Sequence, residues 1–297
     1  MKKIISSFSI IALVAAFAIG GTTAFFSDTE TSTGNVFTAG SIDLKVDSQC
    51  HYYQYDPENE EANEEGYVDV GCDGFGVWEE SDLGVQQFFD FSDLKPGDWG
   101  EDTISLHVYD NDAWGQFNFQ VTSDKDNSCQ EPEIADVDEP ACAQNNAGEL
   151  RSQTLFTLWL DQGSTPGFQN YEPDSEEEIV DEEEGDNVWQ SENEPVVYTE
   201  AVLDNGDNEV DLASILSNTF ESVCEGDANE DGDDDYGYCH GIAEDGRLVG
   251  STTYQFGLMW SIPTSVGNEA QTDSFGGDVV LSVAQHRNQS NPYEVED

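Results

Sequence analysis

The sequence predicts an all-β fold, a jelly-roll antiparallel β-sandwich with one or two short helices and acidic loop insertions. Three observations support this class. Short apolar segments rich in β-branched and aromatic residues recur along the chain, only two segments have helical character, and acidic stretches separate the apolar ones. Aromatic residues make up 11% of the 297 residues, which is enough to build a core.

The predicted strands share alternating or continuous apolar character, and they cover residues 35–46, 102–109, 114–121, 153–160, 195–202, 248–262 and 278–284. Within one of them, we expect Trp114, Phe117, Phe119 and Val121 to point inward. The helical segments are 210–220 and a short turn near 266–273, and residues 94–98 form a tight Pro-Gly turn between strands. The acidic insertions at 56–66, 123–148, 172–194 and 225–236 are expected to be solvated surface loops.

The charge balance restricts the class of partner. The chain has 64 Asp and Glu against 8 Lys and Arg, for a formal charge of −56. Binding to nucleic acid or to an anionic membrane requires clustered basic residues, so neither is expected. A carboxylate-covered, lysine-poor surface is typical of halophilic proteins, because salt screens the self-repulsion. An acidic secreted protein of a non-halophile is the alternative.

The amino terminus resembles an export signal. Lys2 and Lys3 precede an apolar run of about 16 residues, which is shorter than the roughly 20 that span a bilayer. Small residues follow, and we expect cleavage after Ala24. Removal of residues 1–24 takes away two lysines, so the charge changes from −56 to −58. No stable membrane span is expected after cleavage, although a retained anchor is the alternative.

Six cysteines are consistent with an oxidising compartment. They form three couples that are local in sequence, each around an acidic, Gly/Asn-rich stretch. We therefore favour the pairs Cys50–Cys72, Cys129–Cys142 and Cys224–Cys239 among the fifteen pairings that six cysteines allow. No CxxC motif occurs, so zinc ribbons and thioredoxin-type chemistry are not expected.

One acidic loop begins like a calcium-binding loop. Asp227, Asn229, Asp231 and Asp233 place oxygen ligands at alternate positions, and a glycine stands at the sixth position. The twelfth position, where an EF-hand has a bidentate Glu, is Tyr238. A hydrated acidic loop is therefore the preferred interpretation, and calcium is the only cofactor that the sequence suggests.

No motif indicates an enzyme. The four histidines have no HExxH or other two-histidine spacing, and the GxSxG, P-loop and GxGxxG patterns are absent. An acid pair for glycoside hydrolysis is not excluded by counting, since carboxylates are so numerous.

Asn288 begins an N-glycosylation sequon, Asn-Gln-Ser.

The segment that follows the signal is the most specific feature of the sequence. Residues 24–46 (AFFSDTETSTGNVFTAGSIDLKV) resemble the amino-terminal signature of the TasA/camelysin (CalY) family of secreted β-rich proteins. Residues 91–108 with Asn111–Trp114, and residues 260–288, resemble two further blocks of that family. The acidic insertions and the cysteine couples depart from its shorter bacterial members.

The resemblance implies a jelly-roll subunit of extracellular matrix fibres or bundling pili, exported through a SipW-type signal peptidase and assembled as a head-to-tail homopolymer. It also implies that the mature amino-terminal segment pairs with the sheet of the next subunit. Some family members carry a metalloprotease label, for which this sequence offers no metal-ligand motif.

The residues themselves agree with such a donor strand. Phe25 and Phe26 begin a segment rich in β-favouring residues, and Gly34 supplies a joint where the chain can leave its domain. The expected organisation is a signal peptide at 1–24, a donor-strand segment at 25–35, one sandwich domain at 36–290 and a tail at 291–297. Two alternatives remain open. Residues 25–34 fold back onto their own subunit or fray, or the protein is a monomeric surface module that binds polysaccharide or calcium.

Overall fold

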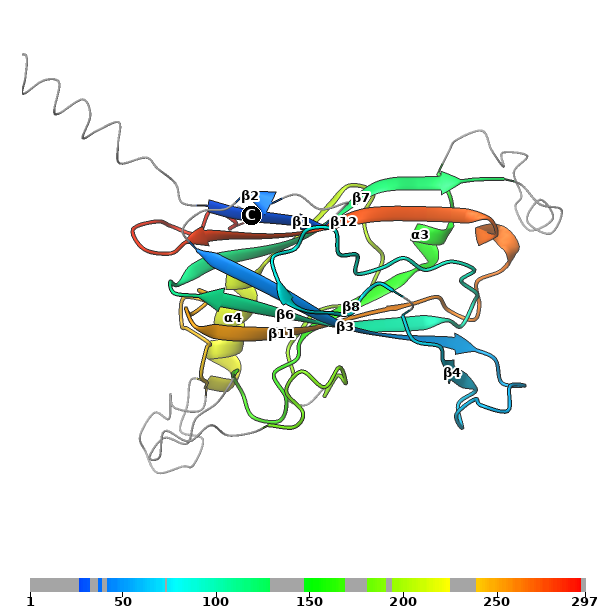
Figure 1. Cartoon of the computed structure of the whole chain (residues 1–297), viewed down its shortest axis with the longest axis horizontal. Coiled ribbons are helices and arrows are strands. Elements are labelled where there is room, and N and C mark those ends of the chain that lie inside the picture. Colours follow the sequence, from blue (N-terminus) through cyan, green and yellow to red (C-terminus); the bar gives the residue numbers. More distant parts are fainter. Residues whose placement is uncertain are drawn as a thin grey trace, which may run out of the picture.

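Two antiparallel β-sheets face each other in the computed structural model of the chain (Figure 1). The structure describes residues 27–32, 37–38, 42–72, 74–128, 147–168, 181–190, 194–224 and 239–294. Every pair of neighbouring strands is antiparallel. The predicted all-β sandwich is therefore confirmed.

The first sheet contains five strands in the order β10-β7-β12-β1-β2. Their bounds are β10 Asp207–Asp211, β7 Ala113–Asp126, β12 Asp273–Gln285, β1 Ser27–Ser32 and β2 Phe37–Thr38. β7 and β12 are the long central strands, and both are visible in the upper layer of Figure 1. The short β1 and β2 form one edge of this sheet.

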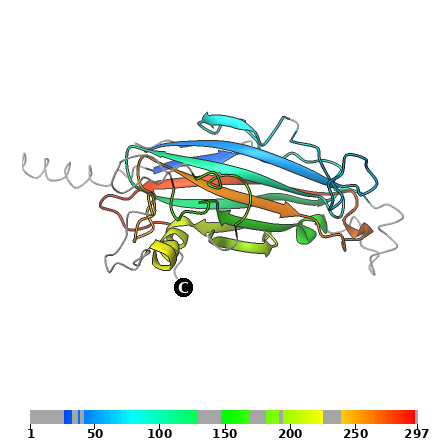
Figure 2. The same cartoon turned by 90° about the horizontal axis from the view of Figure 1, so that it is seen from below.

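The second sheet contains seven strands in the order β4-β3-β6-β11-β8-β9, with β5 also paired to β3. Their bounds are β4 Tyr67–Asp69, β3 Asp43–Tyr55, β6 Trp99–Tyr109, β11 Thr252–Ser261, β8 Leu155–Leu160, β9 Val196–Ala201 and β5 Trp78–Ser81. The view from below shows the strands of both sheets running along the length of the sandwich (Figure 2).

The core lies between the sheets, because alternate residues of each strand point to that side. On β3 the buried residues alternate from Leu44 to Tyr52. Phe117 of β7 meets Phe256 of β11 edge to face, with ring centroids 4.8 Å apart. Three of the four predicted inward residues lie as expected: Phe117 and Phe119 are buried in this core, and the half-buried Val121 packs against it. The prediction for Trp114 is wrong, because Trp114 is three residues from Phe117 and so points to the other face of β7, where it packs on the His286 ring and donates to the Gln289 carbonyl at 3.2 Å.

Helices are short and lie at the ends of the sandwich (Figure 1). α4 (Leu212–Thr219) falls within the predicted helical segment 210–220, and the Asp211 side chain caps it by accepting a hydrogen bond from the Ala213 amide at 3.1 Å. A π-helical turn, Phe220–Cys224, continues it. The predicted turn near 266–273 contains a 3₁₀ helix, Asn268–Ala270. α3 (Leu150–Gln153) was not predicted, since four residues are too few for a helical period.

The structure divides one predicted strand in two. Residues 35–46 contain β2 in the first sheet and the beginning of β3 in the second, so the chain changes sheets between Thr38 and Asp43. The tight turn at 94–98 forms as predicted. The Asp98 amide donates to the Lys95 carbonyl at 2.9 Å, and Gly97 adopts the positive φ of 97° that this turn requires.

Two of the acidic insertions are less solvated than predicted. The stretch 123–148 begins inside β7, which runs to Asp126. The stretch 172–194 ends on Glu194, whose side chain is buried. Paired and hydrogen-bonded carboxylates can be buried, so a count of acidic residues does not reveal which of them lie inside.

Candidate functional site

The edge of β12 carries the amino-terminal strand. β1 pairs antiparallel with β12, from Ser27 opposite Ala284 to Ser32 opposite Val279. β2 then pairs with the outer side of β1, where Thr38 lies opposite Thr29. The amino-terminal segment therefore forms a hairpin on the sheet edge of its own chain, and this is the fold-back arrangement rather than an extended donor strand.

Only half of the β12 edge is covered in this way. Residues 273–278 of β12 pair with β7 on one side. On the other side, no strand in the described part of the chain pairs with them. A strand edge of this kind presents backbone N–H and C=O groups that a further extended segment can bind.

A cavity of about 1150 Å³ adjoins this uncovered half of β12. Its wall is rich in apolar side chains from both sheets and from the loop before β6: Phe88, Phe89, Phe91, Phe119, Val121, Phe156, Trp260, Phe275 and Val279. Asp90, Asp93 and Asp278 are among its polar lining residues. A segment added to the β12 edge would place alternate side chains against an apolar wall.

The loop that forms one wall of the cavity is held by Asp98. This carboxylate is fully buried and accepts hydrogen bonds from the Tyr52 hydroxyl (3.0 Å), the Tyr55 amide (3.1 Å) and the Lys95 amide (2.9 Å). These three hydrogen bonds compensate the free-energy cost of burying the carboxylate. The loop thereby has a fixed position next to β3.

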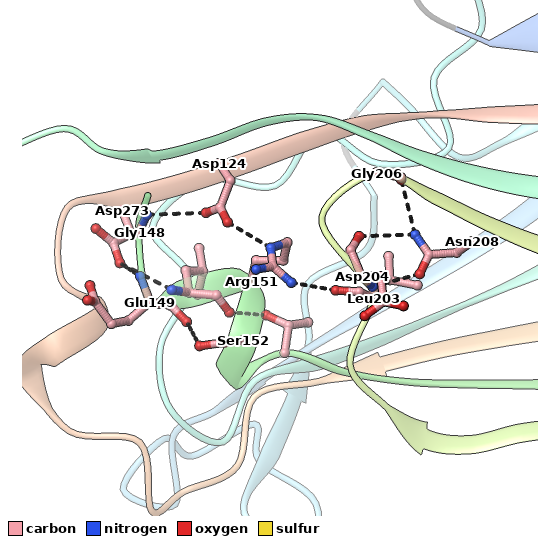
Figure 3. A network of polar contacts seen from close by, with 12 residues as sticks. Asp124, Gly148, Glu149, Arg151, Ser152, Leu203, Asp204, Gly206, Asn208 and Asp273 are labelled. Atoms are coloured by element: carbon pink, nitrogen blue, oxygen red, sulfur yellow. Dashed lines mark hydrogen bonds and ion pairs between the residues drawn. The ribbon is translucent and has the colours of Figure 1, made fainter. Parts of the chain in front are cut away.

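A polar network lies beside the cavity, and Leu150, Leu203 and Asp273 of this region line it (Figure 3). Arg151 of α3 donates from Nε to Asp124 of β7 at 2.7 Å and from Nη1 to the Leu203 carbonyl. Asp273, at the start of β12, accepts from the Glu149 and Leu150 amides, the latter at 3.1 Å. Burial raises the pKa of both the Asp273 and Glu149 carboxyls. The network fixes the free end of β12 through α3.

Several predicted site residues lie outside the described residues. These are Ala24, Phe25, Phe26, Gly34, the calcium candidates Asp227, Asn229, Asp231 and Asp233, and the couple Cys129 and Cys142. Asn288 of the sequon is described, and it is exposed in a turn with a φ of 64°. The tail predicted from residue 291 begins against the domain, since the Asn291 side chain donates from Nδ2 to the Asp211 carboxylate at 3.1 Å.

Two of the three expected disulfides fall within the described residues, and both are present there. Cys50–Cys72 joins β3 to the segment after β4, with Cα atoms 6.0 Å apart. Cys224–Cys239 joins the end of the π-helical turn to the segment before β11, with Cα atoms 5.7 Å apart. Each closes a local loop that contains an acidic insertion.

The described residues contain no group of three or more His, Cys, Asp or Glu that could hold a metal ion. His107 instead joins three strands of the second sheet. Its Nε2 lies 2.6 Å from Asp47, and its Nδ1 lies 2.8 Å from the Thr253 hydroxyl. These contacts satisfy polar groups on the sheet surface and do not form a metal-ligand set.

Sequence analysis missed a buried carboxyl pair, Asp161 and Glu194, on the second sheet. Asp161 is fully buried and Glu194 is 4% exposed. Thirty-two residues separate them. Glu194 ends an acidic stretch, whereas Asp161 follows an apolar segment, so no motif in the sequence links the two. Burial is the dominant cause of a raised pKa in both carboxyls.

Residues 1–52 match the protein-family model described as camelysin metallo-endopeptidase. The match confirms the TasA/camelysin resemblance over this amino-terminal part of the chain. The metal site implied by the family description has no ligand set among the described residues. No curated protein and no solved structure matches the chain. No helix in the described part is long and apolar enough to cross a membrane.

Proposed function

We propose, from the family match of residues 1–52, that this TasA/camelysin-type chain is a secreted, non-enzymatic subunit of extracellular matrix fibres or bundling pili. The observation that carries the proposal is the β1–β2 hairpin on the β12 edge, because it marks an edge that accepts the amino-terminal strand. A structural role also agrees with the family match, because TasA/camelysin proteins are secreted matrix proteins. The carboxylate-rich surface suits an exported protein in a salty medium.

Assembly is proposed to occur by strand exchange. β1 leaves its own β12 and takes the same place beside β12 of the next copy, which is a form of strand addition. This contact is heterologous, since the donor and acceptor surfaces differ. It therefore does not close into a dimer and leads to a head-to-tail filament.

Opening of the hairpin lengthens the donor strand. Residues 27–38 number 12, as do residues 273–284 of β12. A straight segment in the register of β1 would continue past Ser32 along the uncovered half of β12 and end opposite Asp273. Val36 would then lie opposite Phe275, on the side of the apolar cavity, and Phe37 would point to the other face of the sheet. The exchanged strand would gain pairing along β12 that the hairpin lacks.

Export is the step that makes the donor segment available. We propose that a SipW-type signal peptidase cleaves after Ala24 and frees Phe25 and Phe26 at the new amino terminus. Residues 36–290 then form the sandwich domain. Calcium at residues 227–233 and glycosylation at Asn288 remain proposals for the finished subunit.

Disulfide trapping tests the exchange. Thr29 and Ser282 lie opposite each other in β1 and β12, so a Thr29→Cys, Ser282→Cys double variant should cross-link within one chain as a positive control. Assembly of a mixture of the two single variants should give disulfide-linked dimers between different chains. A mixture of Thr29→Cys with Ser290→Cys, an exposed position after the turn at 287–288, is the matched control. Cross-linking no greater than in that control, from protein that remains monomeric, would favour the surface-binding module instead.

A further inference from the structure

Two carboxyl groups hold the segment between β8 and β9 by its backbone. Asp161 follows directly after β8, and its amide donates to the Gln255 carbonyl of β11 at 3.0 Å. Its two carboxylate oxygens accept from the amides of Gly185 (3.0 Å) and Asn187 (3.1 Å). The turn at 181–190 is therefore tied to the end of β8.

Glu194 completes the arrangement from the other end of the segment. Its Oε1 accepts from the Gly163 amide at 3.0 Å, and its Oε2 accepts from the Gln190 amide at 2.8 Å. Four backbone amides of one segment thus depend on two buried carboxyls. The backbone at Gly163 packs closely against the turn 181–190, because a Cβ on Gly163 would lie 2.6 Å from the Glu184 nitrogen.

The negative charge of Asp161 acts together with burial to raise the pKa of Glu194. Ionisation of both buried carboxyls would add charge repulsion to the free-energy cost of desolvation, so one retains its proton. Burial acts first on both groups and raises the pKa of each.

The charged groups around the pair act in the same direction. Asp186, from the turn itself, raises the pKa of Asp161 by its negative charge. Glu101 lies on β6, which is separated from β8 by β11, and burial together with Asp161, Asp186 and Asp69 raises its pKa to about 7. An acidic surrounding of this kind favours the protonated pair.

We propose that the Asp161–Glu194 pair is a proton-dependent clamp, which fastens the acidic turn 181–190 to the second sheet and releases it on deprotonation. The native pKa lies above the ordinary carboxyl value. The stabilisation is therefore complete below the ordinary value and is lost as pH rises through the native one. The clamp lies on the sheet that does not contain β1, so it is independent of strand exchange.

Hydrogen exchange of the four amides tests the clamp, with protection factors corrected for the base-catalysed intrinsic rate. The full mature chain is measured from about pH 6 to about pH 9.5. Protection should fall by up to about tenfold per pH unit until the native pKa of the pair is reached, and it should level off above that pKa, because the closed and open forms are then both ionised. The amides of β11 serve as an internal reference in the same spectra. Constant protection of the four amides over this range would overturn the clamp.

A variant at Glu194 distinguishes the effect of ionisation from an effect on folding. Glu194→Gln keeps the size of the side chain and removes its ability to ionise, at the loss of one acceptor oxygen. Its protection should be somewhat lower than in the wild type and should no longer fall at high pH. Glu182→Gln removes one charge from an exposed position of the same turn, and it should keep the wild-type pH dependence. Equal behaviour of the two variants would contradict the proposal, and the wild-type titration decides it if Glu194→Gln does not fold.

Discussion

Ser32 of β1 lies opposite Val279 of β12, and at this pair the amino-terminal strand ends while β12 continues to Asp273. The hairpin turns back to β2 here and leaves the rest of the β12 edge without a strand on that side among the described elements. The uncovered half adjoins the aromatic cavity. In the strand-exchange proposal, this hairpin is the form of the amino-terminal segment before it moves to the next copy.

Removal of the amino-terminal segment should stop assembly. A mature chain without residues 25–34 retains both long sheets, so we expect a folded monomer that forms no fibres by electron microscopy and sedimentation. A synthetic peptide of residues 25–38 should bind the vacant edge and raise the Tm of the truncated protein. A peptide with the same composition in scrambled order is the control. Normal polymerisation of the truncated protein would contradict strand exchange.

The arrangement of the core was predictable because its signals are local. Alternation in β3 and β7 and the turn at Gly97 follow from the period of two and from turn chemistry. The hairpin of β1 was predictable only as an alternative, since the same strand-favouring residues suit pairing within one chain or between chains. The Asp161–Glu194 pair was not predictable, because its burial depends on tertiary contacts that bring distant residues together.

Stability should depend strongly on salt. The chain carries a formal charge of −56, and the screening length grows from about 3 Å at 1 M salt to about 10 Å at 0.1 M. Repulsion among surface carboxylates therefore increases on dialysis to low salt, and the Tm should fall. Thermal unfolding is to be followed at both concentrations, with potassium chloride and sodium chloride compared. An equal or higher Tm at low salt would contradict adaptation to a saline medium.

Asp102 should make stability depend on pH. Its carboxyl is fully buried on β6, it accepts one hydrogen bond from the Ser48 hydroxyl at 3.3 Å, and burial raises its pKa well above the ordinary value. A raised native pKa means that stability falls as pH increases above the ordinary Asp value. In Asp102→Asn this slope should be shallower, by up to about 1.4 kcal/mol per pH unit. Urea unfolding at a series of pH values measures it, and the exposed Glu183→Gln should keep the wild-type slope.

The disulfides should be local. Peptide mapping without reduction should recover Cys50–Cys72 and Cys224–Cys239, as in the structure, and Cys129–Cys142 as the remaining pair. Cys224–Cys239 closes a loop of 15 residues, and such a loop contributes about 3 kcal/mol in the chain-entropy account. A Cys224→Ser, Cys239→Ser double variant should lose stability of this order in chemical denaturation. Recovery of a long-range cross-link such as Cys50 to Cys239 would overturn the local pairing.

Substitution of Arg151 should lower the free energy of unfolding much more than substitution of an exposed cation. Asp124 is only 4% exposed and Arg151 17%, so Arg151→Met leaves a buried carboxylate without its partner and releases the Leu203 carbonyl. Removal of one partner from a buried pair typically costs about 3–5 kcal/mol, whereas an exposed pair contributes about 1 kcal/mol or less. Lys95→Met breaks the exposed contact with Asp93 and is the matched control. In the double variant Asp124→Asn, Arg151→Met, the unpaired charge is gone, so part of the lost stability should return in urea unfolding. Equal effects of Arg151→Met and Lys95→Met would show that the network in Figure 3 does not hold α3 to β7.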